Sequence, residues 1–142
     1  MKTSKKLRTI KTAFAAAAVA LGLSIFSVAK ADSRPVADIS EWQGYITLSQ
    51  AKKMKQEFRG VILRVQYGED YRDKVFAHNE AVLRQADMKY GVYAFGQYRN
   101  APDAASEARA LYRRAPHALF YVNDAEQYTT YSGTFAAATQ RW

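Results

Sequence analysis

GVILRVQY, at residues 60–67, is the stretch that decides the fold of this chain. Its nearly continuous apolar run is typical of a β-strand covered on both faces. Similar β-prone runs occur at residues 35–40, 90–98 and 118–123, and the strands, starting near residues 35, 61, 91 and 119, lie 26 to 30 residues apart. Because that spacing is the length of one strand-and-crossover unit, the sequence predicts an α/β protein with a parallel sheet and right-handed crossovers.

The segments between the strands carry apolar stripes with the period of a helix, at residues 48–58, 75–86 and 104–115. The third helix is the best delimited, with Asn100 as its predicted cap and Pro102 in its first turn. Strands alternating with helices fit either an open doubly wound sheet or a (β/α) barrel. The nucleotide-binding version of the open sheet is disfavoured, because no GxGxxG motif follows the first strand.

Residues 1–31 have the three parts of an export signal: a lysine-rich start, an uncharged apolar run at residues 13–28, and the small-x-small sequence Ala29-Lys30-Ala31. Cleavage is predicted before Asp32. The alternative is a retained membrane anchor, but the apolar run is at the short limit of the roughly 17–25 residues that span a bilayer. We therefore expect a secreted protein with no stable membrane anchor after cleavage.

Composition narrows the class of protein further. The net charge of +8 is concentrated in the signal, and residues 32–142 carry 15 basic and 13 acidic side chains, a net of only +2. That balance gives no indication of a nucleic-acid partner. The chain has no cysteine, and His78 and His117 lack zinc-binding spacing, so neither a metal site nor a cofactor is expected.

Acidic and aromatic residues follow the predicted strands at their carboxyl ends, which is where α/β folds place their active sites. Carboxylates supply the acid and the charged helper that glycoside cleavage needs, and aromatic rings stack on sugars. The candidates are Asp38, Trp42, Tyr93, Phe95, Asp124 and Glu126.

The spacing Asp124-x-Glu126 gives the strongest chemical indication. On a strand, side chains two residues apart point to the same face, with Cα atoms roughly 6.5 Å apart. Two carboxyl groups at that distance repel when both are ionised, so the pKa of one should rise and keep a proton available. The alternative interpretation is a solvated acidic turn after the strand.

Three other candidates also have structural explanations. Asp38 fits an Asx-turn or a helix cap as well as a catalytic role, and Trp42 could fill the mouth of a barrel. Arg64 could point inward and hold a carboxylate, or point outward beneath a helix. Glu41, Glu69 and Asp70 are expected to be exposed loop acids.

The sequence DISEWQG, at residues 38–44, resembles the opening motif of glycoside hydrolase family 25, the lysozymes of the Chalaropsis type. The resemblance continues, in order, through residues 61–64, 91–95 and 121–126, the last of which resembles the Asp-x-Glu strand end of the family. One departure is Ala94, where the family often has histidine.

This resemblance implies the first four β/α units of a TIM-like (β/α)5β3 barrel. It implies a lysozyme-like muramidase that hydrolyses the β-1,4 bond between N-acetylmuramic acid and N-acetylglucosamine in peptidoglycan. Glu126 would be the proton donor, and Asp124 and Asp38 the further catalytic carboxylates. An enzyme carboxylate or the substrate's own acetamido group could assist the reaction. The expected substrate-binding residues are Trp42, Tyr93, Phe95 and Arg64.

Length qualifies that expectation. Residues 32–142 number 111, whereas a complete barrel takes roughly 200 residues or more. The resemblance therefore implies the N-terminal part of a catalytic domain, incomplete at its C-terminus, with another helix starting within residues 132–142. The alternative function is a non-catalytic remnant that at most binds cell-wall glycan.

Overall fold

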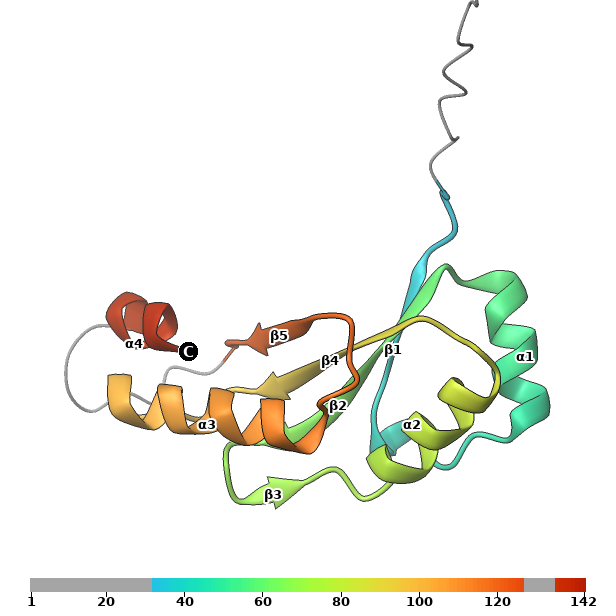
Figure 1. Ribbon diagram of the computed structural model, residues 1–142. Helices are drawn as coiled ribbons and strands as arrows, with labels where there is room; N and C mark the ends of the chain where they lie inside the picture. The colour runs from blue at the N-terminus through green and yellow to red at the C-terminus, as the bar shows by residue number, and fades with distance from the viewer. Residues whose placement is uncertain (1–31, 127–134) are drawn as a thin grey trace, which may run out of the picture. The chain divides into compact units, whose positions relative to one another are not determined.

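The computed structural model describes residues 32–126 and 135–142 (Figure 1). The predicted export signal, residues 1–31, lies outside them and stays a prediction. Among the described residues, no helix has the length and apolar character needed to cross a membrane. The elements are, in order, β1 (Val36–Ile39), the 3-10 helix η1 (Glu41–Gln43), α1 (Leu48–Glu57), β2 (Gly60–Tyr67), β3 (Tyr71–Arg72), α2 (Phe76–Gln85), β4 (Tyr90–Phe95), α3 (Ala101–Arg114), β5 (Tyr121–Asp124) and α4 (Phe135–Arg141).

Four strands form a parallel sheet in the order β1-β2-β4-β5, which confirms the predicted α/β class. The central strand β2 pairs Leu63 with Ile39 of β1 on one side and with Val92 of β4 on the other. Its bounds are those predicted. β4 ends at Phe95, earlier than predicted, because the chain leaves the sheet at Gly96 towards α3.

The short strand β3 was missed by the sequence pattern. It pairs antiparallel with the end of β2, Tyr71 opposite Tyr67 and Arg72 opposite Gln66. The intervening turn uses Gly68 at φ 62°, a conformation that favours glycine. A two-residue strand has no periodicity to detect, so only the turn could have indicated it.

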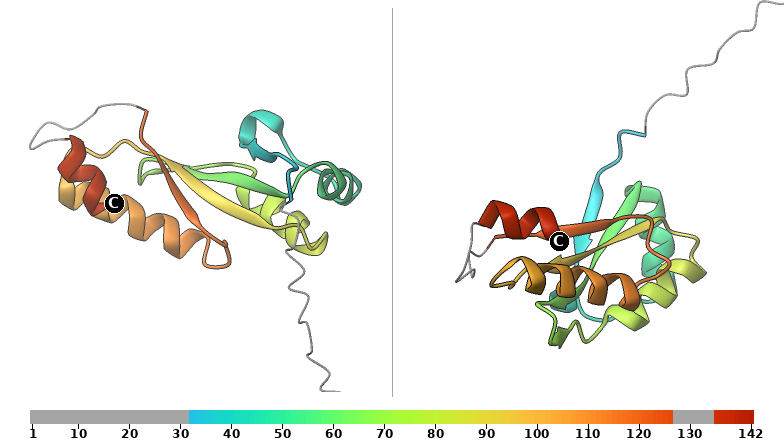
Figure 2. Two further views of the ribbon diagram at one scale, coloured as in Figure 1. Left: turned by 90° about the horizontal axis from the view of Figure 1, so that it is seen from above. Right: turned by 60° about the vertical axis from the view of Figure 1, so that its left-hand side comes forward.

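All three crossover helices cover the same face of the sheet. Ala51 of α1, Leu83 of α2 and Leu111 of α3 belong to one buried cluster with strand residues from that face. We call this the covered face; its residues are Ile39, Val61, Leu63, Val92 and Ala94. Figure 2 shows α3 running beside the strands with α4 next to it.

This one-sided packing corrects two expectations. A doubly wound sheet would carry helices on both faces, so that alternative is wrong for the described residues. The expectation that β2 is covered on both faces is also wrong, because Ile62 and Arg64 point away from the helices and keep part of their surface in solvent. The sheet does not close within the described residues.

Local signals explain where the helices begin. Thr47 caps α1 through a capping box, in which its hydroxyl accepts the Gln50 amide at 3.2 Å and its own amide donates to the Gln50 side chain at 2.8 Å. Asn100 caps α3 as predicted, accepting the Asp103 amide at 3.0 Å. The helix begins at Ala101, as this cap predicts, and its apolar stripe begins only after the first turn.

The predicted fourth helix is present as α4, although residues 132–134 lie outside the described part of the chain. It packs on α3 and the loop before it. The ring of Phe135 stacks on that of Tyr98 with centroids 6.1 Å apart, and the Tyr98 hydroxyl is 2.8 Å from Thr139 Oγ1.

Candidate active site

The face of the sheet opposite the helices carries most of the predicted site residues. Parallel pairing places Arg64 opposite Tyr93, Tyr93 opposite Val122, and Phe95 opposite Asp124. Paired residues of parallel strands share a face, and residues two apart on a strand do so too. We call this the bare face; its residues are Asp38, Ile62, Arg64, Tyr93, Phe95, Val122 and Asp124.

Carboxyl groups from two strands converge on Tyr93. The pKa of Tyr93 is raised to about 12, first by burial and then by the negative charges of Asp38 of β1 and Asp124 of β5. Arg64 opposes this shift with its positive charge. The bare face therefore gathers Asp38 and Asp124 around one hydroxyl group, although they lie 86 residues apart in the sequence.

Asp124 and Glu126 form the predicted carboxyl pair, with a changed backbone setting. β5 ends at Asp124, so Glu126 is not on the strand, and the prediction that both belong to it is wrong. The pKa of Asp124 is nevertheless raised, first by burial and then by the negative charge of nearby Glu126, with a smaller effect of Asp38. Asp124 is half-buried, whereas Glu126 is exposed to solvent.

Trp42 lies in η1, the turn that follows β1, and is 81% exposed. Its side chain therefore lies in solvent and does not pack among the buried side chains of the sheet. Ser40 caps this turn, accepting the Trp42 amide at 3.4 Å, while the Ser40 amide donates to the Gln43 side chain at 2.7 Å. The cap of this turn is therefore Ser40 and not Asp38.

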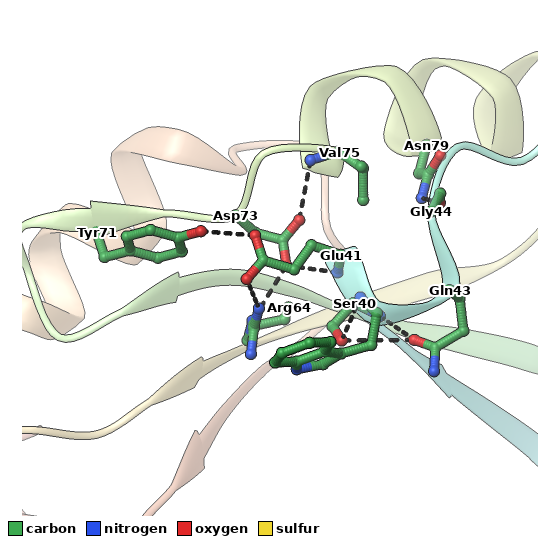
Figure 3. Close-up of polar contacts among 10 residues, drawn as sticks. Ser40, Glu41, Gln43, Gly44, Arg64, Tyr71, Asp73, Val75 and Asn79 are labelled. Carbon is green, nitrogen blue, oxygen red and sulfur yellow. Dashed lines mark hydrogen bonds and ion pairs between the residues drawn. The ribbon is translucent and has the colours of Figure 1, made fainter.

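Arg64 points inward and holds two carboxylates, the first of its two predicted alternatives (Figure 3). Its Nη2 lies 2.9 Å from Glu41 Oε1, and its Nε lies 3.0 Å from Asp73 Oδ2. The Tyr71 hydroxyl donates to Glu41 Oε2 at 2.6 Å. We call Glu41, Arg64, Tyr71 and Asp73 the polar clamp.

Sequence reasoning missed most of the polar clamp. Glu41 was expected to be an exposed loop acid, yet its side chain is only 20% exposed because Arg64 and Tyr71 cover it. Asp73 is fully buried. Both Tyr71 and Asp73 belong to the β2–β3 hairpin and its exit, so recognising that hairpin would have been needed to find them.

Aromatic residues border the carboxyl cluster. The rings of Phe95 and Tyr67 stack, with centroids 4.8 Å apart and planes 19° from parallel. Phe95 pairs with Asp124 in the sheet register, so this stacked pair lies next to one of the candidate catalytic acids. Tyr67 adds an aromatic residue that the sequence analysis did not single out.

A second buried acid, Glu107 of α3, was also missed. It is 2% exposed and accepts the Gln97 amide at 3.1 Å. Burial raises its pKa to about 7. It lines a polar cavity of about 280 Å³ beside the end of β2, together with Glu69 and Asp70, and lies outside the bare face. Helical spacing presented Glu107 only as an early acidic residue, which gave no sign of its burial.

Within the described residues, no group of three or more histidine or acidic side chains is placed to hold a metal ion. His78 contacts the Ile46 carbonyl at 3.0 Å through Nε2 and meets the ring of Tyr45 edge-on. Its surroundings are those of a structural histidine on α2.

Comparison with models of protein families matches residues 37–142 to "Glycosyl hydrolases family 25". Comparison with curated proteins gives no match.

Several solved structures share the fold. The catalytic domain of endolysin ply40 from bacteriophage P40 of Listeria monocytogenes is 24% identical with a TM-score of 0.69, over 75% of this chain and 53% of that one. The modular autolysin LytC from Streptococcus pneumoniae, in complex with a synthetic peptidoglycan ligand, is 28% identical with a TM-score of 0.57, over 66% of this chain and 22% of that one. A bacterial lysozyme from Streptomyces coelicolor is 25% identical with a TM-score of 0.52, over 65% of this chain and 45% of that one. The chain thus spans about half the length of the endolysin domain. It spans less than half the length of the other two proteins.

Proposed function

The chain belongs to glycosyl hydrolase family 25, and from that premise we propose that its bare face is the substrate groove of a secreted muramidase. The substrate would be the glycan strand of peptidoglycan, cleaved at the β-1,4 bond between N-acetylmuramic acid and N-acetylglucosamine. The open sheet would then form the first β/α units of a (β/α)5β3 barrel. The observation that carries the proposal is the strand register, which places Asp38 of β1, Tyr93 of β4 and Asp124 of β5 on one face of the sheet, with Glu126 just after Asp124.

Glu126 is the proton donor in this proposal. It is exposed at the end of β5 and can approach the glycosidic oxygen, whereas Asp124 behind it is half-buried. The proton of the Glu126 carboxyl group would pass to the leaving oxygen as the bond to the anomeric carbon breaks. Water would later add to that carbon, and its proton would return to Glu126.

Asp124 and Asp38 supply negative charge for this step. The carboxylate of Asp124 would stabilise the positive charge on the sugar or orient its 2-acetamido group. The pKa of Asp124 is raised, first by its burial and then by the nearby charge of Glu126. Asp38 would add a further negative charge on the same face of the sheet.

Aromatic residues would bind the sugar rings around these acids. Trp42 offers an exposed indole after β1, and Phe95, backed by Tyr67, offers a ring beside Asp124. Tyr93 would contact the substrate at the centre of the groove. Arg64 would contact the substrate beside Tyr93, its partner in the sheet register. No cofactor enters this mechanism, and the only partner proposed is the glycan strand.

The test is release of new reducing ends from purified peptidoglycan, with the new ends identified as muramic acid or glucosamine. We expect muramic acid ends from the wild-type chain, and a loss of about 100-fold or more in rate for Glu126→Gln. The matched control is Asp70→Asn, which neutralises an exposed acid near the end of β2 that lies outside the bare face.

Two outcomes would contradict the enzymatic proposal. If the wild-type chain releases no ends beyond those from Glu126→Gln but still sediments with insoluble wall material, the chain is a glycan-binding remnant. If it neither releases ends nor sediments, the bare face is not a glycan groove in this chain.

A further inference from the structure

We propose that the polar clamp is a positioning device that fixes Trp42 as a preformed stacking platform for a sugar ring. This inference rests on the proposed function, because it assigns a binding role to Trp42. It makes Arg64, Asp73 and Tyr71 positioning residues that act through the turn η1.

The buried carboxylate of Asp73 joins three segments of the chain. Its Oδ2 accepts the backbone amide of Glu41 at 2.9 Å and Arg64 Nε at 3.0 Å, and its Oδ1 accepts the Val75 amide at 3.0 Å (Figure 3). One side chain thus ties the start of η1 to β2 and to the start of α2. Charge-assisted bonds of this length are among the stronger contacts in proteins.

The side chain of Glu41 adds a second connection to the same turn. It receives Arg64 Nη2 at 2.9 Å on one oxygen and the Tyr71 hydroxyl at 2.6 Å on the other. The Tyr71 hydrogen bond, followed by smaller effects that include the charge of Arg64, lowers the pKa of Glu41. The turn is therefore held by both the backbone and the side chain of the residue that precedes Trp42.

The far side of the turn is held independently. Asn79 of α2 is fully buried, donates from Nδ2 to the Gly44 carbonyl at 3.0 Å, and accepts the Ile46 amide at 3.0 Å. Gly44 itself has φ 71°, so the chain reverses there at little steric cost. Asp73 and Asn79 thus fix the two ends of the segment that carries Trp42.

Apolar packing does not explain this arrangement. None of the three residues of η1 is buried, and Trp42 itself is 81% exposed. A turn without an apolar anchor depends on polar contacts for a fixed position. A large aromatic side chain held in water on such a turn is typical of a binding surface.

The clamp also adjoins the candidate catalytic cluster. Arg64 pairs with Tyr93 in the sheet register, and Tyr93 lies on the same face of the sheet as Asp38, whose charge raises its pKa. Trp42 is thereby fixed relative to the strand that carries Asp38. A platform ordered before binding loses less conformational entropy when a sugar stacks on it, which raises affinity.

The experiment uses the full chain with Trp142→Phe, so that Trp42 is the single tryptophan. In that background we compare Tyr71→Phe with Tyr90→Phe. Each substitution removes one hydroxyl group that donates to a carboxylate, since Tyr90 donates to Glu80 at 2.7 Å away from the clamp. Two quantities are measured: the fluorescence anisotropy of Trp42 without ligand, and the Kd for a soluble tetrasaccharide fragment of peptidoglycan.

We expect Tyr71→Phe to lower the anisotropy and to raise Kd by about 3-fold to 10-fold, the ratio that corresponds to one hydrogen bond. Tyr90→Phe should change neither the anisotropy nor Kd, although Tyr71→Phe and Tyr90→Phe should lose similar stability. In a Trp42→Ala chain, Tyr71→Phe should leave Kd unchanged, because the residue through which it acts is gone.

The inference is overturned if Tyr71→Phe leaves the anisotropy unchanged, or if it raises Kd equally in the Trp42→Ala chain. Failure of the proposed function gives a different result. If the wild-type chain binds no glycan fragment, that function is wrong, and the anisotropy still decides whether the clamp holds Trp42.

Discussion

The covered face and the bare face of the sheet are built from the same strands but differ in what their side chains do. In β2, Leu63 is 1% exposed and packs under the helices, while its neighbours Ile62 and Arg64 point to the bare face and keep part of their surface in solvent. The covered face gains free energy by removing apolar surface from water. The bare face holds ionisable groups close together, which stabilises the fold little and creates chemical reactivity.

Stability should therefore reside on the covered face. Leu63→Ala is expected to lower the free energy of unfolding by about 4 kcal/mol, because it removes buried contacts and leaves a cavity. Ile62→Ala, one residue away on the bare face, should lower it by about 1 kcal/mol. Chemical denaturation of both variants measures the difference, and equal losses would show that the bare face is packed as tightly as the covered one.

Glu107 sharpens the comparison, because it is a buried acid outside the bare face. Its pKa of about 7 in the folded chain exceeds the usual 4.5, so the folded state binds its proton more tightly than the unfolded state does. The free energy of unfolding should fall as the pH rises from about 4.5 to about 7 and then level off.

Glu107→Gln should remove this fall and make the chain more stable at pH 8 by up to about 3 kcal/mol. Thermal or urea unfolding between pH 4 and pH 8 measures it, with Asp70→Asn as the control for an exposed acid. If the free energy of unfolding of Glu107→Gln falls by the same amount between pH 4 and pH 8, another group causes the pH dependence.

Asp124 is the corresponding acid on the bare face, and its effect on stability should be the smallest. Its raised pKa means that its contribution is complete below the usual pKa of 3.8 and is lost as the pH rises through its folded value. Asp124→Asn should therefore be as stable as the wild type at pH 7, or more stable by less than about 1 kcal/mol.

Hydrolysis by that variant should nevertheless decrease, since the charge that assists Glu126 is removed. Parallel measurement of unfolding and of released reducing ends separates the two effects. A large loss of stability in Asp124→Asn would indicate that the bare face is a structural element rather than a reactive one.

Much of this arrangement was predictable from local patterns. The bounds of β2, the Asn100 cap and the alternating order of strands and helices follow from periodicity and capping, which act over a few residues. The strand-end rule also located Asp38, Tyr93, Phe95 and Asp124 near one another, because parallel strands all end at the same edge of a sheet.

Other features could not be predicted, because they depend on contacts between distant segments. The polar clamp joins Glu41 to Asp73, 32 residues later, through a hairpin that carries no periodic signal. The high pKa of Glu107 arises from burial beneath a loop, which helical spacing does not reveal.

By itself, the sequence determined the α/β class, the alternation of the four parallel strands with helices, and the family, since these depend on local propensity and on short motifs in a fixed order. Only the tertiary structure decided that the helices cover one face, that Arg64 turns inward to Glu41 and Asp73, and that Asp38 meets Tyr93. The physical reason is that burial, ion pairing and pKa depend on which groups the folded chain brings together, and those groups come from different strands.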